Sequence, residues 1–167
     1  MPAEIVLETL GRADGPEFIA ATQASHALHA PWVSPPATPL SYAERLARLQ
    51  PPTGAWLAIR RADTRALVGA AELSEIVRGG FQNAYLGYYG FAGQTGQGLM
   101  TAGLRAVARH AFEELGLHRL EANIQPGNTA SRALARRCGF QQEGYSPRYL
   151  RIGGEWRDHE RWALRAD

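Results

Sequence analysis

Hydrophobic and polar positions alternate in several short segments of the chain and recur at helical spacing in others. Alternating or continuous apolar runs predict strands over 3–9, 55–60, 66–76, 83–91 and 118–124, and closing strands over about 140–150 and 155–164. Apolar residues at helical spacing predict helices over about 14–28, 42–49, 100–115 and 128–137. This order of elements predicts a mixed α/β sheet with helices on its faces, in one domain spanning 1–167.

Polar residues and glycines mark the ends of several predicted elements. Asp14, with Glu17 three residues later, has the spacing of a capping box, and Ser41 is placed to cap the second helix. Gly153 and Gly154 predict a tight hairpin between the two closing strands.

The composition is that of a soluble globular protein. The chain has 167 residues, of which 45% are hydrophobic and 20% charged. No apolar run approaches the roughly 20 residues of a membrane helix, and the first ten residues lack a secretion signal, so we expect no membrane partner and a cytoplasmic location. The single Cys138 cannot form an internal disulfide, and the five histidines show no ligand spacing, so no metal site is expected.

Arginine supplies all 18 basic residues, and the chain contains no lysine. This excludes a Schiff-base lysine, a P-loop lysine and a lysine general base. Arginine binds planar anions, including phosphates. A net charge of +2 is nevertheless too small to indicate direct binding of nucleic acid.

A glycine-rich segment, 93–98, lies between a predicted strand and the amphipathic helix of 100–115. Glycines at a helix start let backbone N–H groups approach an anion, and the helix dipole favours phosphate there. The segment is not a dinucleotide-binding fingerprint, because the third glycine is missing. The residues therefore indicate a pyrophosphate-binding turn for another cofactor.

Three runs of sequence carry a family resemblance. The runs YLGYYGFAGQTGQGLMTAGL, HRLEANIQPGNTASRALARRCGFQQEGY and YLRIGGEWRDHERWAL resemble the GNAT acetyltransferases. Within them, they are most similar to the RimJ/RimL-type branch, which acetylates the N-terminal alanine of ribosomal proteins. The resemblance covers about 3–164. It implies a mostly antiparallel sheet with splayed central parallel strands, flanked by helices, and acetyl-CoA as the cofactor.

The resemblance also implies where the cofactor binds. The family's pyrophosphate motif, Gln/Arg-x-x-Gly-x-Gly/Ala, falls on 93–98, with Gly93 at the position of the family's Gln or Arg. A backbone cradle needs only N–H groups, so this departure removes one side chain and leaves the cradle intact. The residues implied in the cradle and the adjoining helix start are Gln94, Thr95, Gly96, Gln97, Gly98, Leu99 and Met100.

The pantetheine arm is implied to bind beside the preceding strand. Tyr88, Tyr89 and Gly90 are expected to offer it backbone hydrogen bonds where 83–91 and 118–124 splay apart. An unpaired N–H group there can polarise the thioester carbonyl. Gly87 and Gly90 are consistent with a β-bulge that opens the pair, or with simple packing accommodations.

Candidate catalytic residues lie on the neighbouring strand and helix. Asn128 suits a helix N-cap, and the resemblance adds a contact with the pantetheine amides. Ser131 is the candidate acid for the leaving thiolate, because Ala135 stands where many members of the superfamily have a tyrosine. Glu121 is the candidate general base, acting through water, or else the partner of an arginine; Glu72 on an earlier strand is a second carboxylate of this kind.

Four aromatic residues are candidates for the acceptor side: Trp32, Tyr85, Tyr145 and Tyr149. Trp32 lies in a proline-rich loop and is expected either to wall the acceptor site or to cover the core. Tyr85 occupies a position that is often acidic in related proteins. Tyr145 and Tyr149 are expected to line the acceptor cleft or to pack within the closing strands.

These observations leave three hypotheses. The first is an acetyl-CoA-dependent transferase that acts on the N-terminal α-amine of a protein, by direct attack in a ternary complex. The second keeps the chemistry but takes a small amine such as a polyamine, an aminoglycoside or an amino acid. The third is a CoA-binding or ribosome-assembly module without turnover. In each case a monomer or a homodimer is expected.

Overall fold

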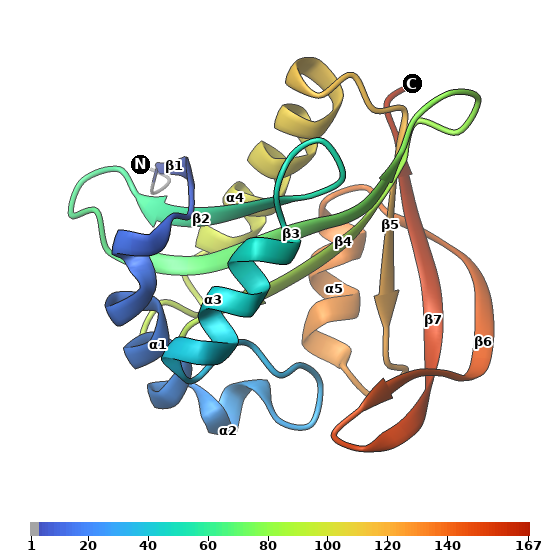
Figure 1. Ribbon diagram of the computed structural model, residues 1–167. Coiled ribbons are helices and arrows are strands. Elements are labelled where there is room, and N and C mark those ends of the chain that lie inside the picture. Colours follow the sequence, from blue (N-terminus) through green and yellow to red (C-terminus); the bar gives the residue numbers. More distant parts are fainter. Residues whose placement is uncertain (1–3) are drawn as a thin grey trace.

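The structure, a computed structural model, describes residues 4–167 and consists of one seven-stranded sheet with helices on both faces (Figure 1). Its strands are β1 (Ile5–Thr9), β2 (Ala55–Arg61), β3 (Leu67–Val77), β4 (Asn83–Gly90), β5 (Arg119–Ile124), β6 (Gln141–Ile152) and β7 (Glu155–Arg165). Its longer helices are α1 (Gly15–Ala24), α3 (Pro39–Arg48), α4 (Leu99–Arg109) and α5 (Thr129–Arg137). Three short helical segments are η1 (Arg12–Asp14), α2 (His26–His29) and η2 (His110–Glu114).

The strand order is β1-β2-β3-β4-β5-β7-β6, and every neighbouring pair is antiparallel except β4–β5. This confirms the predicted fold class. Helices α4 and α5 cover one face of the sheet, and α1, α2 and α3 cover the other face along its β1–β4 half (Figure 1). The β6–β7 hairpin forms the opposite end of the sheet and curls forward (Figure 1).

Each face of the sheet carries its own core. Under α4 and α5 the core is aliphatic, with Ile59, Leu104 and Leu120 completely buried. Under α1 and α3 it is aromatic. The Phe18 ring is fully buried, with its centroid 4.9 Å from that of Trp56. Burying a side chain of this size contributes roughly 2–3 kcal/mol to folding, so both cores hold the sheet rigid beside the site described below.

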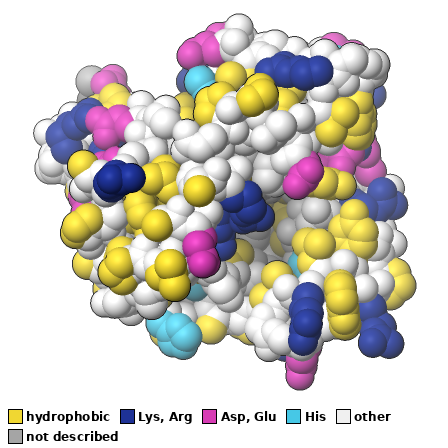
Figure 2. All heavy atoms as spheres, viewed as in Figure 1, with side chains coloured by type: hydrophobic (Ala, Val, Ile, Leu, Met, Phe, Trp, Pro, Cys, Tyr) yellow, Lys and Arg dark blue, Asp and Glu magenta, His cyan; other side chains and the backbone are white. Residues whose placement is uncertain are grey.

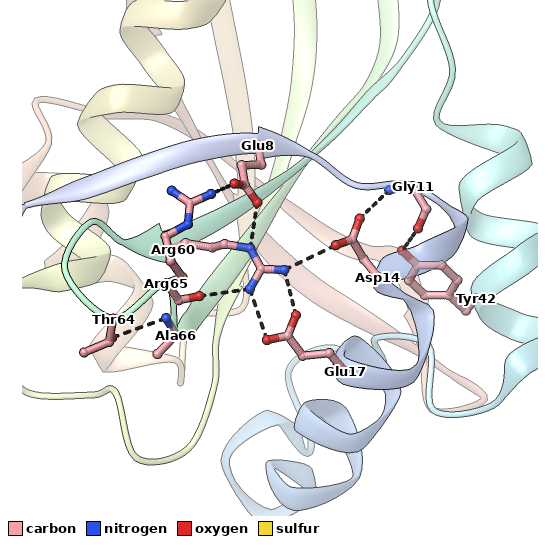
Figure 3. Close-up of polar contacts among 9 residues, drawn as sticks. All are labelled: Glu8, Gly11, Asp14, Glu17, Tyr42, Arg60, Thr64, Arg65 and Ala66. Carbon is pink, nitrogen blue, oxygen red and sulfur yellow. Dashed lines mark hydrogen bonds and ion pairs between the residues drawn. The ribbon is translucent and has the colours of Figure 1, made fainter.

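Arg60 of β2 is buried among three carboxylates that tie β1 and α1 to the sheet (Figure 3). Its guanidinium donates to Glu8 at 2.8 Å, to Glu17 at 2.7 Å and to Asp14 at 3.3 Å. The predicted capping box of Asp14 and Glu17 is therefore wrong. The Asp14 carboxylate is occupied by the Arg60 guanidinium and by the N–H of Gly11, so it caps no N–H of α1.

Two further helix ends differ from the prediction. The predicted helix over 14–28 is divided at Ser25, because the Ser25 hydroxyl accepts the N–H of Ala92 at 2.9 Å. The next long helix begins at Pro39 with Thr38 as its N-cap. The Thr38 hydroxyl accepts the N–H of Ser41 at 3.1 Å, and the Ser41 hydroxyl accepts the N–H of Thr38 at 3.1 Å. Ser41 is therefore the third residue of a capping box and not the N-cap.

Candidate active site

The central feature of the site is the point where β4 and β5 separate. Within the described chain, the two strands pair only at Asn83–Arg119, Ala84–Leu120 and Tyr85–Glu121. Beyond this point β4 stays paired with β3 as far as Gly90, and β5 stays paired with β7 as far as Ile124. The predicted splay of the parallel strands is thus present, and it leaves one edge of β4 without a strand partner.

Backbone groups of β4 face the opening. The N–H of Phe91 donates to the carbonyl of Val68 on β3 at 2.8 Å. Because hydrogen bonds alternate between the two edges of a strand, the N–H groups of Tyr88 and Gly90 lie on the other edge, toward the splay. These are donors that a ligand can use.

The splay does not arise from a bulge at Gly87 or Gly90. The β3–β4 register runs without a shift from Gly90 to Tyr85, and the irregularity lies further along, after Ser74. Gly90 has a packing reason instead: a Cβ there would lie 3.3 Å from Cγ of Met100 in α4. The second interpretation of this glycine, a packing accommodation, is therefore the correct one.

The glycine-rich loop between β4 and α4 has left-handed backbone at three positions. Gly93, Gly96 and Gly98 have φ of 87°, 75° and 72°, and a Cβ at each would meet nothing within 4 Å. Side chains rarely adopt such φ values, so the glycines serve conformation and leave open space above the loop. Gly98 is the N-cap of α4, whose first-turn N–H groups have no partner within the helix and point out of its N-terminus.

A cavity of about 320 Å³ joins this loop to the splay. One wall is the splayed edge of β4, a second is the start of α5, and a third is 28–33, the segment that carries Trp32. The sequence-predicted residues that line it are Trp32, Tyr88, Tyr89, Gly90, Gln94, Thr95, Gly96, Gly98, Leu99, Met100, Asn128 and Ser131. Gln97 does not line the cavity, because its side chain contacts Arg61 at 3.2 Å and the carbonyl of Gly93 at 3.4 Å.

Two hydroxyl groups meet on the cavity wall between β4 and α5. The hydroxyl of Ser131 donates to the Tyr88 hydroxyl at 2.8 Å, and Tyr88 donates to the backbone carbonyl of Ser131 at 3.3 Å. Burial raises the pKa of Tyr88 to about 12, so its proton is retained at neutral pH. Asn128 is the N-cap of α5 and accepts the N–H of Ser131 at 3.2 Å.

Three carboxylates of the opposite face of the sheet, Glu72, Glu121 and Glu143, have arginine partners. Glu121 accepts from Nε of Arg119 at 2.8 Å, and Arg119 also binds Glu143. Glu72, with a side chain only 12% exposed, binds Arg45 at 2.5 Å and accepts from the Tyr89 hydroxyl at 2.8 Å. The space-filling view shows the molecule hollowed between α3 and the β6–β7 hairpin, with arginine side chains at the edge of the hollow (Figure 2).

The structure separates the remaining predicted tyrosines. Tyr85 of β4 and Tyr149 of β6 lie side by side. Burial is the main cause that raises the pKa of Tyr85, and the contact with Tyr149 raises it further. Tyr145 instead contacts Asp158 and is half exposed. Asp158 also accepts the N–H of Arg148 at 2.8 Å, so Tyr145 belongs to a polar cluster of the β6–β7 hairpin and not to the cavity wall.

Two buried polar residues near the opening, His29 and Gln125, were not predicted as site residues. His29 contacts the carbonyl of Gly90, and Gln125 contacts the carbonyls of Pro31 and Trp32.

Across residues 4–167, no cluster of three or more His, Cys, Asp and Glu side chains is arranged to hold a metal ion. In the same range, no helix is long and apolar enough to span a membrane.

The sheet is opened at its one parallel pair, and a glycine loop beside the opening leads into helix α4. This chain also matches a family of known sequences. The family is described as the acetyltransferase (GNAT) domain, and the match spans residues 4–141. The chain therefore belongs to the GNAT acetyltransferase family. This confirms the resemblance carried by the sequence motifs.

Two curated relatives are named N-acetyltransferases, and the name of one of them fits the predicted branch. The ribosomal protein uS5-alanine N-acetyltransferase of Escherichia coli is 42% identical over 102 residues, which cover 61% of this chain and 53% of that protein. The probable N-acetyltransferase YjcK of Bacillus subtilis is 39% identical over 98 residues, which cover 59% of this chain and 54% of that protein. The chain thus spans about half the length of the curated relatives it matches.

A solved structure extends the likeness to almost the whole chain. Mycobacterium smegmatis RimJ, in complex with CoA-disulfide, superposes with a TM-score of 0.88 at 28% identity. The match covers 97% of this chain and 82% of that one.

Proposed function

We propose that the protein is an acetyl-CoA-dependent N-acetyltransferase whose acceptor is the N-terminal α-amine of a protein. The observation that supports this most directly is the single cavity that runs from the glycine loop to the splayed edge of β4. The relatives named above support the acceptor class, because one of them acetylates an alanine of a ribosomal protein. The amine attacks directly, with both substrates bound.

The loop suits the pyrophosphate of CoA. Its left-handed glycines leave the space above the backbone open, and the first-turn N–H groups of α4 point out of the helix N-terminus. Recognition by N–H groups does not need the family's Gln or Arg side chain at Gly93. The splayed edge then offers the N–H groups of Tyr88 and Gly90 to the amides and the carbonyl of the acyl-pantetheine arm.

Bound acetyl-CoA would supply a thioester whose carbonyl carbon is open to attack by an amine. The N–H donors of the β4 edge lie in a partly enclosed site, where they stabilise charge on a carbonyl oxygen more than they would in water. Ser131 is the proton donor to the sulfur, with the Tyr88 hydroxyl behind it. A thiol of pKa near 8.5 is a fair leaving group, so we expect this proton to contribute modestly.

The acceptor must lose a proton before it attacks. An α-amine has a pKa near 8, against about 10.4 for lysine, so the neutral form is much more abundant for a protein N-terminus at neutral pH. Glu121, at the last β4–β5 pair, is our candidate to receive the proton through water. Its bond with Arg119 fixes the carboxylate in place.

The charge pattern favours an α-amine over a polyamine. A polyamine carries several positive charges and needs several free carboxylates. Near the opening, Glu72 and Glu121 are each paired with an arginine, Arg45 and Arg119. A peptide N-terminus brings a single amine and requires no such set.

The test is release of free thiol from acetyl-CoA with peptides that begin with Ala, Ser or Met, beside polyamines, aminoglycosides and free amino acids. We expect release with unblocked peptides and none when the same peptide carries a blocked α-amine. Release with small amines alone would replace the acceptor class. CoA binding without release on any acceptor would contradict the enzymatic function.

A further inference from the structure

One segment crosses the opening between the two splayed strands. Residues 25–33, here called the strap, run from the end of α1 through α2 to Val33. Leu28, Trp32 and Val33 of the strap line the cavity, together with β4 and α5. The strap is fixed on both sides of the splay by buried side chains.

His29 fixes the strap to β4. Its Nε2 lies 2.7 Å from the carbonyl oxygen of Gly90, and the residue is only 5% exposed. A carbonyl oxygen can only accept, so Nε2 carries the hydrogen. Nδ1 is buried without a partner in the described part of the chain, and burial lowers the pKa of His29. The ring is therefore the neutral tautomer with its hydrogen on Nε2.

The bond from His29 holds the peptide group that joins Gly90 to Phe91. On one side of this peptide the Gly90 oxygen accepts from His29, and on the other the Phe91 N–H donates to Val68 of β3 at 2.8 Å. The peptide plane is thus held from both edges. In an ordinary sheet the next strand would supply the first of these bonds, but β5 has already separated.

Gln125 fixes the strap to the other side of the splay. It directly follows β5 and is 8% exposed. Its side-chain amide donates to the carbonyl of Pro31 at 3.3 Å and lies 3.5 Å from that of Trp32. The Trp32 ring also packs against Gly127, where a Cβ would lie 3.3 Å from the ring. One buried side chain therefore anchors the strap to each strand.

We propose that His29 and Gln125 are positioning residues for acyl transfer: through the strap they replace the hydrogen bonds that β4 and β5 lose, and so fix the N–H donors of the β4 edge. The inference rests on the proposed function. Neither residue touches the reacting atoms. His29 acts through the peptide of Gly90, and Gln125 acts through the backbone of Pro31 and Trp32.

Substitutions at His29 separate the hydrogen bond from the volume of the ring. His29→Leu removes the donor. His29→Gln places an amide N–H where Nε2 lies, whereas His29→Asn places its amide near Nδ1, which has no partner. The control is His26→Leu, the same change at an exposed position of the same helix.

We expect His29→Leu and His29→Asn to lower kcat about tenfold or more, since a displacement of about 1 Å can cost 10²-fold. The KM for acetyl-CoA should change less than about threefold, because the phosphates are held by the separate loop of 93–98. His29→Gln should stay within about threefold of the wild type, and His26→Leu within about twofold. The proposal would be overturned if His29→Leu and His26→Leu had equal kcat. It would also be overturned if His29→Asn and His29→Gln had equal kcat.

Hydrogen exchange provides a readout that does not depend on turnover. Amides of 87–92 and 30–33 should exchange faster in His29→Leu than in His26→Leu, because the strap and the β4 edge loosen together. Gln125→Leu should accelerate the same two segments, and the double variant should add little to kcat loss, since both residues act through one strap. If the wild type acetylates no acceptor, the proposed function fails. The positioning role of His29 and Gln125 is refuted separately, if hydrogen exchange in His29→Leu and Gln125→Leu is the same as in His26→Leu.

Discussion

The two faces of the sheet meet at the splay and offer different chemical groups to a ligand. On the face of α4 and α5, the site consists of glycine backbone, helix N–H groups and the hydroxyls of Tyr88 and Ser131. On the face of α1 and α3, it consists of charged side chains that already bind one another, such as Glu72 with Arg45. Under the proposed function the face of α4 and α5, here called the cofactor face, would bind CoA mainly with its backbone. The face of α1 and α3, here called the acceptor face, would contact the acceptor with side chains.

The difference also has an energetic side. Glu72 and Glu121 on the acceptor face are paired with arginines at partly buried positions. Breaking such a pair leaves an uncompensated charge that can cost about 3–5 kcal/mol when fully buried. The open glycine loop contains no such pair. Changes on the cofactor face should therefore affect binding directly, whereas changes on the acceptor face should act through geometry and stability together.

The largest effect is expected for Gly96→Glu. The substitution combines φ of 75°, strained for any side chain by about 1–2 kcal/mol, with a negative charge where the phosphates of CoA are proposed to lie. We expect CoA affinity, measured by calorimetry, to fall about 100-fold or more, because the carboxylate repels the phosphates at short range, whereas the strain lowers the stability of the protein.

Two controls separate charge from strain. Gly96→Ala keeps the strain and adds no charge, so it should retain most of the affinity. Gly79→Glu introduces the same side chain at φ of 68°, with equally open surroundings, in the turn between β3 and β4. It should lose stability but bind CoA normally. Normal binding by Gly96→Glu would remove the loop from the cofactor site.

A smaller effect is expected for Glu121→Gln on the acceptor face. If Glu121 receives the proton of the amine, kcat should fall about tenfold or more. Glu143→Gln is the matched control, because Glu143 binds the same Arg119 but is 41% exposed. The measurement is kcat of the wild type, Glu121→Gln and Glu143→Gln over a range of pH. Equal losses in the two variants would mean that Glu121 only holds Arg119.

The same contrast between the faces explains what the sequence could predict. The glycine loop, the strand before it and the cap of α5 are contiguous in the chain, so their motifs specified most of the cavity lining in advance. Gly96 and Asn128 are examples, because each works through the backbone beside it. The mostly antiparallel sheet and the splay were implied by the family resemblance that these motifs carry, whereas the order of the strands in the sheet was not predicted.

Contacts between distant segments could not be predicted in this way. Asp14 and Glu17 had a capping pattern, but Arg60, more than 40 residues away, binds both carboxylates (Figure 3). His29 stands in no motif and Gln125 has no role in the run that contains it, and the contacts of both with the strap become apparent only in the structure. A buried histidine or glutamine finds its partner through tertiary packing, which local spacing does not encode.

The most subtle effect separates a helix cap from a cofactor contact. Asn128→Ala removes the bond from Ser131 N–H and should cost about 1 kcal/mol of stability. Thr38→Ala removes the equivalent cap of α3, whose bond is of similar length, 3.1 against 3.2 Å. Both variants should lower Tm by about 2–4 °C.

Only Asn128→Ala should lose activity per folded molecule. We expect a loss of about fivefold, because one hydrogen bond to the cofactor contributes about 1 kcal/mol. Equal activities would make Asn128 a cap alone, and the cofactor face would then rely on backbone and hydroxyl groups only.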